Sequence, residues 1–134
     1  MAGYSGTPLA KKLGIKAGDE VLLDGAPAGF TVDGRPDGVT VRRRAGSGPY
    51  PVIVAFCPDL KRLRSRWDRL HELTTTAGVL WIAWPKKASG VVTDLTENAV
   101  REHALAHGRV DVKVCAIDDV WSGLANVVRV KDRS

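Results

Sequence analysis

The stretch that most constrains the fold is residues 79–90, VLWIAWPKKASG, in which an apolar run from Val79 to Trp84 stops at Pro85. A short, continuous apolar run that ends at a proline is typical of a strand buried on both faces of a parallel sheet. The carboxyl ends of such strands form the edge where open α/β sheets bind their ligands. We therefore expect a central strand over 79–84, followed by a loop that contributes to a ligand crevice.

The composition predicts one domain without a membrane anchor. With 134 residues, 44% of them hydrophobic, the chain is long enough for a single α/β domain over residues 1–134 with its own core. No run reaches the roughly 18 apolar residues of a membrane span, and the first residues lack the apolar stretch of about 7–15 residues found in a signal peptide. These features favour a cytoplasmic protein.

The two cysteines, Cys57 and Cys115, have no partner at metal-ligand spacing. In a cytoplasmic protein we expect both to be reduced, structural thiols, with a disulfide between them as the alternative. Cys57 follows a predicted strand and is the one nucleophile candidate near the expected crevice.

Apolar periodicity places the other elements. A helix is expected over 8–13, capped by Thr7 and ended by Gly14, and a second begins at Asp59 with an apolar stripe from Leu60 to Leu73 that includes Trp67 as a core residue. The third helix is expected over 95–107, begun by a capping box of Asp94 and Glu97. Further strands are expected at 21–23, 39–41, 51–56, 110–117 and 124–130, with 74–78 as a connection.

The order of these elements predicts an α/β fold with three layers and a mostly parallel sheet. The connection over 118–123 is too short for a parallel crossover, so the last two strands should be antiparallel neighbours. We expect the 79–84 strand to lie between the 51–56 strand and the final strand, and the half-polar 110–117 strand to lie at an edge. Residues 30–41 contain two Asp-Gly turn signals, which leaves a hairpin and a crossover as alternatives.

The unit PVIVAFCPDLKRLRSRWDRLHELTTTAGVLWIAWP resembles the strand-helix-strand unit of S-adenosylmethionine-dependent methyltransferases, a Rossmann-like family in which a terminal antiparallel strand inserts between the two before it. VLLDGAPAGF stands where that family has its glycine-rich cofactor turn. Proline replaces the central glycine, Leu23 stands at the preceding acidic position, and Arg42 replaces the ribose-binding acid. The resemblance thus implies a reduced methyltransferase-like fold in which S-adenosylmethionine is a disfavoured cofactor.

A second resemblance covers most of the chain. GYSGTPLAKKLGIKAG, WIAWPKKASGVVTDLTENAVREHAL and VDVKVCAIDDVWSGLANVVR are similar to stretches of a small bacterial family known as a domain of unknown function. It implies no activity. The chain departs from that pattern at Arg109 and at Ala125-Asn126.

Loops at the carboxyl ends of the predicted strands bring together the candidate ligand-binding residues. Lysines can bind an anion, Ser89 and nearby amides can donate to it, an aspartate can accept from a hydroxyl or amine, and tryptophans such as Trp84 offer a flat face. The alternative is that these residues are solvated, cap turns or fill the core. The candidates are Gly25, Ala26, Pro27, Gly29, Lys86, Lys87, Ser89, Gly90, Asp118 and Trp121.

One basic region accounts for the net charge of +5. Between residues 42 and 69 the sequence has eight basic residues and two aspartates, so the rest of the chain is close to neutral. It can be the solvated face of a helix or an anion-binding surface. His103 and His107 are one helical turn apart, which fits interaction with a helix C-terminus better than a metal pair. Nucleic acid contact is expected, if at all, through Arg42, Arg43, Arg44, Arg62 and Arg66.

Three functions follow from this sequence. The first is a non-catalytic or regulatory protein that binds a small anion or a protein partner in the crevice. The second is a small enzyme, either an aberrant methyltransferase or one acting on another small molecule. The third is a nucleic-acid-associated basic protein, for which no recognised binding motif is present.

Overall fold

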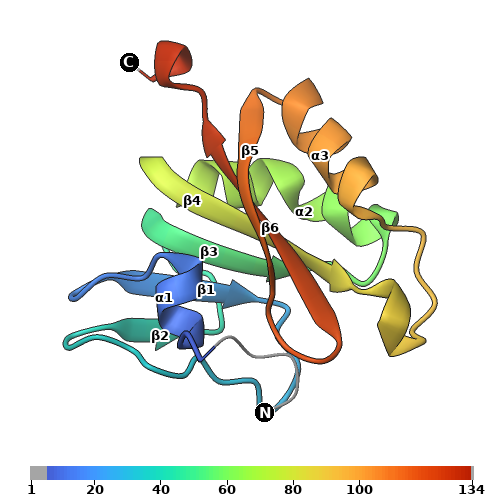
Figure 1. Ribbon diagram of the computed structural model, residues 1–134. Coiled ribbons are helices and arrows are strands. Elements are labelled where there is room, and N and C mark those ends of the chain that lie inside the picture. Colours follow the sequence, from blue (N-terminus) through green and yellow to red (C-terminus); the bar gives the residue numbers. More distant parts are fainter. Residues whose placement is uncertain (1–5, 134) are drawn as a thin grey trace.

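The computed structural model describes residues 6–133, which form an α/β domain around one six-stranded mixed sheet (Figure 1). The strands are β1 (Glu20–Asp24), β2 (Thr40–Arg42), β3 (Tyr50–Phe56), β4 (Thr74–Pro85), β5 (Arg109–Ala116) and β6 (Trp121–Val128). The helices are α1 (Leu9–Leu13), α2 (Leu60–Leu73) and α3 (Glu97–Ala106), with short 3₁₀ turns η1 (Lys87–Ser89) and η2 (Val130–Asp132). The strand order is β2-β1-β3-β4-β6-β5, and the first four strands in it are parallel.

The central place of β4 is confirmed. It pairs in parallel with β3 on one side and antiparallel with β6 on the other. The expectation that residues 74–78 form a connection is wrong, because β4 begins at Thr74, directly after α2. Thr74 pairs with Tyr50 of β3, and its hydroxyl donates to the Leu70 carbonyl of α2 at 2.8 Å. Pairing with a strand that is distant in the sequence therefore extends β4 back to the end of the helix.

The antiparallel C-terminal pair is also confirmed, with β5 at the edge of the sheet. The strand β6 begins at Trp121, three residues before its predicted start. The reason is a tight turn, in which one carboxylate oxygen of Asp118 accepts from the backbone N–H groups of Val120 and Trp121, both at 2.8 Å.

The segment between β1 and β2 is a crossover, because the two strands are parallel. The hairpin alternative is therefore wrong. Residues 25–39 contain no helix and run as turns, and Val32 is buried in the core beside α1 instead of pairing in the sheet. The backbone N–H of Ala10 donates to the Asp33 carbonyl at 3.0 Å, which fastens this segment to the start of α1.

The expected Thr7 cap of α1 is wrong, because the Ala10 amide that it would bind donates to the Asp33 carbonyl instead. Pro8 occupies the N-cap position of α1 without a side-chain cap, while Gly14 ends the helix in the left-handed conformation as expected. In α3 the cap is Thr96, whose side chain accepts from Ala99 N–H, instead of Asp94. Asp94 instead accepts from the first amide of α2, Leu60 N–H, at 2.8 Å.

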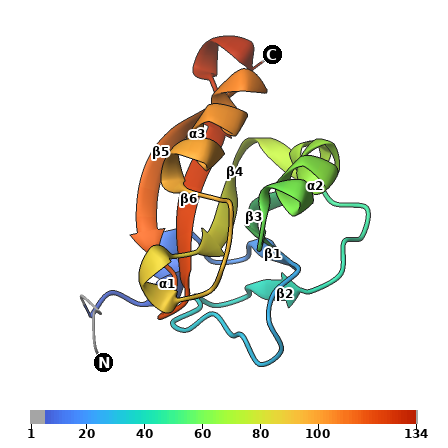
Figure 2. The same cartoon turned by 90° about the vertical axis from the view of Figure 1, so that its right-hand side faces the viewer.

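Helices cover both faces of the sheet, which makes three layers (Figure 2). One face carries α2 and α3, whose apolar residues, among them Trp67, pack against Ile53, Leu80 and Leu124. The other face is covered by α1 and the 25–39 segment, packed on Val54, Trp81 and Ala125. The alternation of strand side chains between two separate apolar clusters is what a sheet buried on both faces requires.

Candidate ligand-binding site

The loops that follow β1, β3 and β4 lie at one edge of the sheet, together with the turn that joins β5 to β6. This arrangement follows from the parallel direction of β1, β3 and β4 and from the antiparallel pairing of β6 with β4. The topology therefore brings the segments that contain the sequence-predicted residues to one edge.

A cavity of about 450 Å³ opens at this edge, on the face that α1 covers. Its walls come from the start of α1, the second half of the loop after β1, and the β5–β6 turn. Two of the predicted residues, Gly29 and Asp118, line it. The lining residues are Gly6, Thr7, Pro8, Leu9, Lys12, Gly29, Phe30, Thr31, Asp33, Ile117 and Asp118.

The polar groups of this cavity, which we call the edge cavity, are of mixed sign. Its lining includes two acidic residues, Asp33 and Asp118, and one basic residue, Lys12, together with Thr7 and Thr31. Asp118 uses one carboxylate oxygen for the backbone of the β5–β6 turn, which fixes its position at the wall.

The apolar side of the cavity rests on packed aromatic rings. Phe30 meets Phe56 edge-to-face at 4.9 Å between centroids, and Phe56 meets Trp121 in the same way at 5.1 Å. Trp121 and Ala26 pack against the core on this face, so Trp121 supports the wall and does not line the cavity. Arg43 donates to the backbone carbonyls of Pro27 and Phe30, which holds the loop after β1 in place.

The KKASG loop lies outside the edge cavity. The Lys86 amide donates to the Val120 carbonyl at 2.7 Å, and Ser89 closes its own turn by donating to the Lys86 carbonyl and accepting from Val91 N–H. Gly90 ends η1 in the left-handed conformation. Lys86, Lys87, Ser89 and Gly90 are therefore not brought to the cavity, and their contacts fit the alternative in which these residues build a turn.

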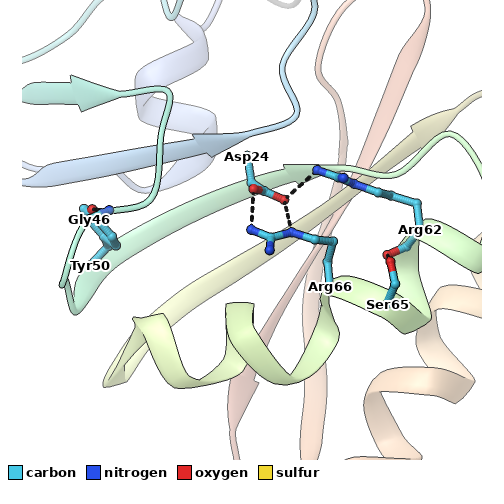
Figure 3. Close-up of polar contacts among 6 residues, drawn as sticks. All are labelled: Asp24, Gly46, Tyr50, Arg62, Ser65 and Arg66. Carbon is cyan, nitrogen blue, oxygen red and sulfur yellow. Dashed lines mark hydrogen bonds and ion pairs between the residues drawn. The ribbon is translucent and has the colours of Figure 1, made fainter.

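The glycine turn after β1 lies against an arginine of α2 on one side. Gly25 has φ +71°, and a Cβ there would lie 3.1 Å from the Arg62 guanidinium and 3.2 Å from the Phe56 carbonyl. Arg62 donates to Asp24 at 3.3 Å, and Arg66 donates to both carboxylate oxygens of Asp24 at 3.1 and 2.7 Å (Figure 3). A ligand cannot approach Gly25 from this side without displacing an arginine.

Sequence reasoning missed the Asp24 cluster. The β1 strand was expected to end at Leu23, yet it includes Asp24, which is only 8% exposed. The available signal was one carboxylate at the end of an apolar run, together with two arginines four residues apart on the following long helix.

Cys57 is a buried free thiol. Burial raises its pKa to about 12, although the nearby Arg62 works in the opposite direction. A thiol with that pKa is protonated at neutral pH, so Cys57 lacks the thiolate that a nucleophile needs.

The basic residues expected to meet nucleic acid are mostly engaged within the protein. Arg42 pairs with Glu20, Arg43 holds the loop after β1, and Arg62 and Arg66 bind Asp24. These contacts make the cluster between residues 42 and 66 a set of structural links between strands, loop and helix.

The histidines of α3 contact each other and the core. The rings of His103 and His107 stack at 4.1 Å, and Trp67 packs edge-on against His103 at 4.8 Å. Within residues 6–133 no group of three or more His, Cys, Asp or Glu side chains is placed to hold a metal ion.

No protein-family model matches the chain, and no curated protein matches it either. Among the residues that the structure describes, no helix is both long and apolar enough to cross a membrane. The fold and the edge cavity therefore carry the functional argument.

Proposed function

We propose that the protein is a non-catalytic binding protein that holds a small, partly apolar ligand in the edge cavity. The cavity itself is the observation that carries this proposal, because it lies where open α/β sheets bind ligands and combines an apolar wall with a few polar groups. No described thiol or histidine lines it, so the cavity offers binding groups without an evident nucleophile and base pair.

The charges favour an amine over an anion. Asp33 and Asp118 outnumber Lys12 in the lining, so a phosphate or other dianion would meet more negative than positive charge. A protonated amine can instead pair with one carboxylate while its apolar part lies on Phe30, Leu9 and Ile117. This ligand differs from the small anion that the lysines of the KKASG loop suggested.

We also propose that the architecture is a reduced form of the methyltransferase-like fold. The position of antiparallel β6 between β4 and β5 supports it, since the family resemblance implies that insertion. The cofactor turn argues against methyl transfer, because residues 25–39 contain no helix and the Arg62 guanidinium lies against one side of Gly25. The proposed ligand therefore lies in the edge cavity and not on the glycine turn.

Two phenyl probes of similar size and opposite charge test the proposal. In ¹H–¹⁵N NMR titrations, phenethylamine should shift the amides of Gly29, Thr31 and Asp118 in a saturable manner, and phenylacetate should shift them far less. Asp118→Asn keeps the oxygen that accepts in the turn but removes the charge, so it should weaken phenethylamine binding about 5- to 20-fold.

Asp119→Asn is the matched control, because Asp119 is the exposed neighbour and does not line the cavity. It should bind phenethylamine like the unmodified protein. Equal loss in both variants, or saturable shifts confined to residues away from the cavity, would contradict the proposal.

A further inference from the structure

A buried arginine lies at the other end of the strands, away from the edge cavity, where β4 and β5 begin and β6 ends. Arg109 is the first residue of β5 and is only 1% exposed. Charged side chains are almost never buried to this degree unless a partner of opposite charge accompanies them. Arg109 therefore needs an explanation that the fold alone does not supply.

The partners of Arg109 are both neutral. Its Nε donates to Nδ1 of His71 at 3.0 Å and its Nη1 to the backbone carbonyl of Asn126 at 3.4 Å. In the described part of the chain no ion pair includes Arg109, whereas Arg62, Arg66 and Arg101 all bind carboxylates. Burial lowers its pKa to about 10, so the guanidinium still carries its charge at neutral pH.

The contact with His71 fixes the state of that imidazole. Because the guanidinium only donates, Nδ1 of His71 must accept, and the proton of the neutral ring lies on Nε2. Burial and the charge of Arg109 lower the pKa of His71, which keeps the ring neutral. His71 thus holds the arginine without neutralising it and retains an N–H donor.

A second cavity, of about 320 Å³, opens beside this pair, and we call it the arginine cavity. It lies under the end of α2 and beside η2, which follows β6 at the top of Figure 1. Besides the charge of Arg109 it offers the imidazole of His71 and the hydroxyls of Thr74 and Thr76. Its lining residues are His71, Glu72, Thr74, Thr76, Arg109, Val128 and Asp132.

A buried amide next to Arg109 adds to the polar character of this region. Asn126 is fully buried, and neither its side-chain oxygen nor its side-chain nitrogen has a hydrogen-bonding partner in the protein. Its backbone carbonyl is the one that accepts from Arg109. A buried polar side chain without a partner is costly for stability, so this end of β5 and β6 holds both an unpaired amide and an arginine without a counterion.

We propose that the arginine cavity binds a small carboxylate through Arg109. The planar guanidinium matches a carboxylate, and the anion supplies the opposite charge that the buried arginine lacks. Glu72 and Asp132 also line the cavity, but each is paired with an arginine, at 3.7 Å for Arg69 and 3.0 Å for Arg129, so the charge of the lining without a counterion is that of Arg109. A carboxylate with a single charge balances it, whereas a dianion such as phosphate adds excess negative charge beside two carboxylates.

Thermal unfolding of the full chain tests this assignment with sodium propionate, sodium phosphate and sodium chloride at equal ionic strength. Propionate at ten times its dissociation constant should raise the midpoint by about 3–5 °C over chloride. Phosphate should raise it less. Arg109→Met should abolish the propionate effect, whereas Arg64→Met, which removes an exposed arginine on α2, should retain it.

An NMR titration of the unmodified protein with propionate keeps the test valid if Arg109→Met does not fold. Saturable shifts of the Arg109 Nε–H and of the Thr76 and Val128 amides are expected. No difference between propionate and chloride, an equal rise in Arg109→Met, or saturation at Gly29 and Asp118 instead would overturn the assignment. A stronger effect of phosphate than of propionate would overturn the choice of a carboxylate.

Discussion

Asp24 at the end of β1 and Arg66 on α2 are joined by two parallel hydrogen bonds, of 3.1 Å from Nε and 2.7 Å from Nη2. The contact links the end of β1 to helix α2. Arg62, one helical turn before Arg66, donates to the same carboxylate. This polar link occupies the place where the family resemblance put a cofactor turn.

Asp24→Asn should lower the free energy of unfolding by about 1–3 kcal/mol, because it leaves two partly buried guanidinium groups without their carboxylate. Urea unfolding measures this change. Glu20→Gln is the control on the same strand, since Glu20 and Arg42 form an exposed pair and its loss should lower the stability much less. Equal losses would show that the Asp24 link adds nothing beyond a surface pair.

Cys57 should be inert in the folded protein, because burial raises its pKa to about 12. In the Cys115→Ala variant, which leaves Cys57 as the single thiol, reaction with a disulfide reagent at pH 8 should be at least ~100-fold slower in buffer than in denaturant. Rapid reaction without denaturant would refute the assignment of Cys57 as a structural thiol.

Stability should fall on acidification through His71. Burial first, and then the charge of Arg109, lower its pKa below the ordinary value of 6.5, with His107 acting in the same direction and Asp68 and Glu72 opposing. Between the folded and the ordinary pKa the unfolded chain binds more protons. The contribution of His71 is therefore complete above about pH 6.5 and is lost as the pH falls through the folded pKa.

Urea midpoints at pH 7.5, 6.5 and 5.5 measure this dependence. His71→Gln keeps an acceptor for Arg109 but does not titrate, so its pH profile should be flatter by up to about 1.4 kcal/mol per pH unit. His103, whose pKa burial also lowers, retains its own share of the slope. An unchanged profile in His71→Gln would contradict the assignment.

Gly34→Ala should loosen α1. Gly34 has φ +73°, and a Cβ there would lie 2.3 Å from Cβ of Pro8, the residue at the N-cap position of α1. Gly18→Ala is the control, because Gly18 has φ +80° with nothing within 4 Å of the added atom. Gly18→Ala should cost the strain of the left-handed conformation alone, about 1–2 kcal/mol, and Gly34→Ala should cost more.

The apolar pattern predicted the sheet well and its polar details poorly. The run from Val79 to Trp84 was enough to identify the central strand, because only a position covered on both faces accepts such a run. The threonines that begin β4 carry no comparable signal, since Thr74 joins the sheet by pairing with Tyr50, which is far away in the sequence. Local propensity cannot report pairing with a distant strand.

The two cavities depend on distant contacts in the same way. Topology predicts that Gly29 and Asp118 lie at one end of the sheet, and both line the edge cavity, but Thr7, Lys12 and Asp33 join them only because α1 packs on the loop after β1. Arg109 was noted as a departure from a family pattern, and its burial could not be read from a charged residue at the start of an edge strand. The lysines of the KKASG loop were conspicuous in sequence and build a turn.

The two faces of the sheet are covered by very different amounts of regular helix. On one face lie helices of 14 and 10 residues, while the other is covered by a helix of 5 residues and an irregular crossover. A helix that short does not hold its shape without packing, so amide hydrogens of α1 should exchange with solvent through local opening well before those of β3 and β4. The walls of the edge cavity are part of that weaker cover. A ligand bound there would therefore slow exchange across α1 and the crossover, and part of its binding free energy would be spent on closing them.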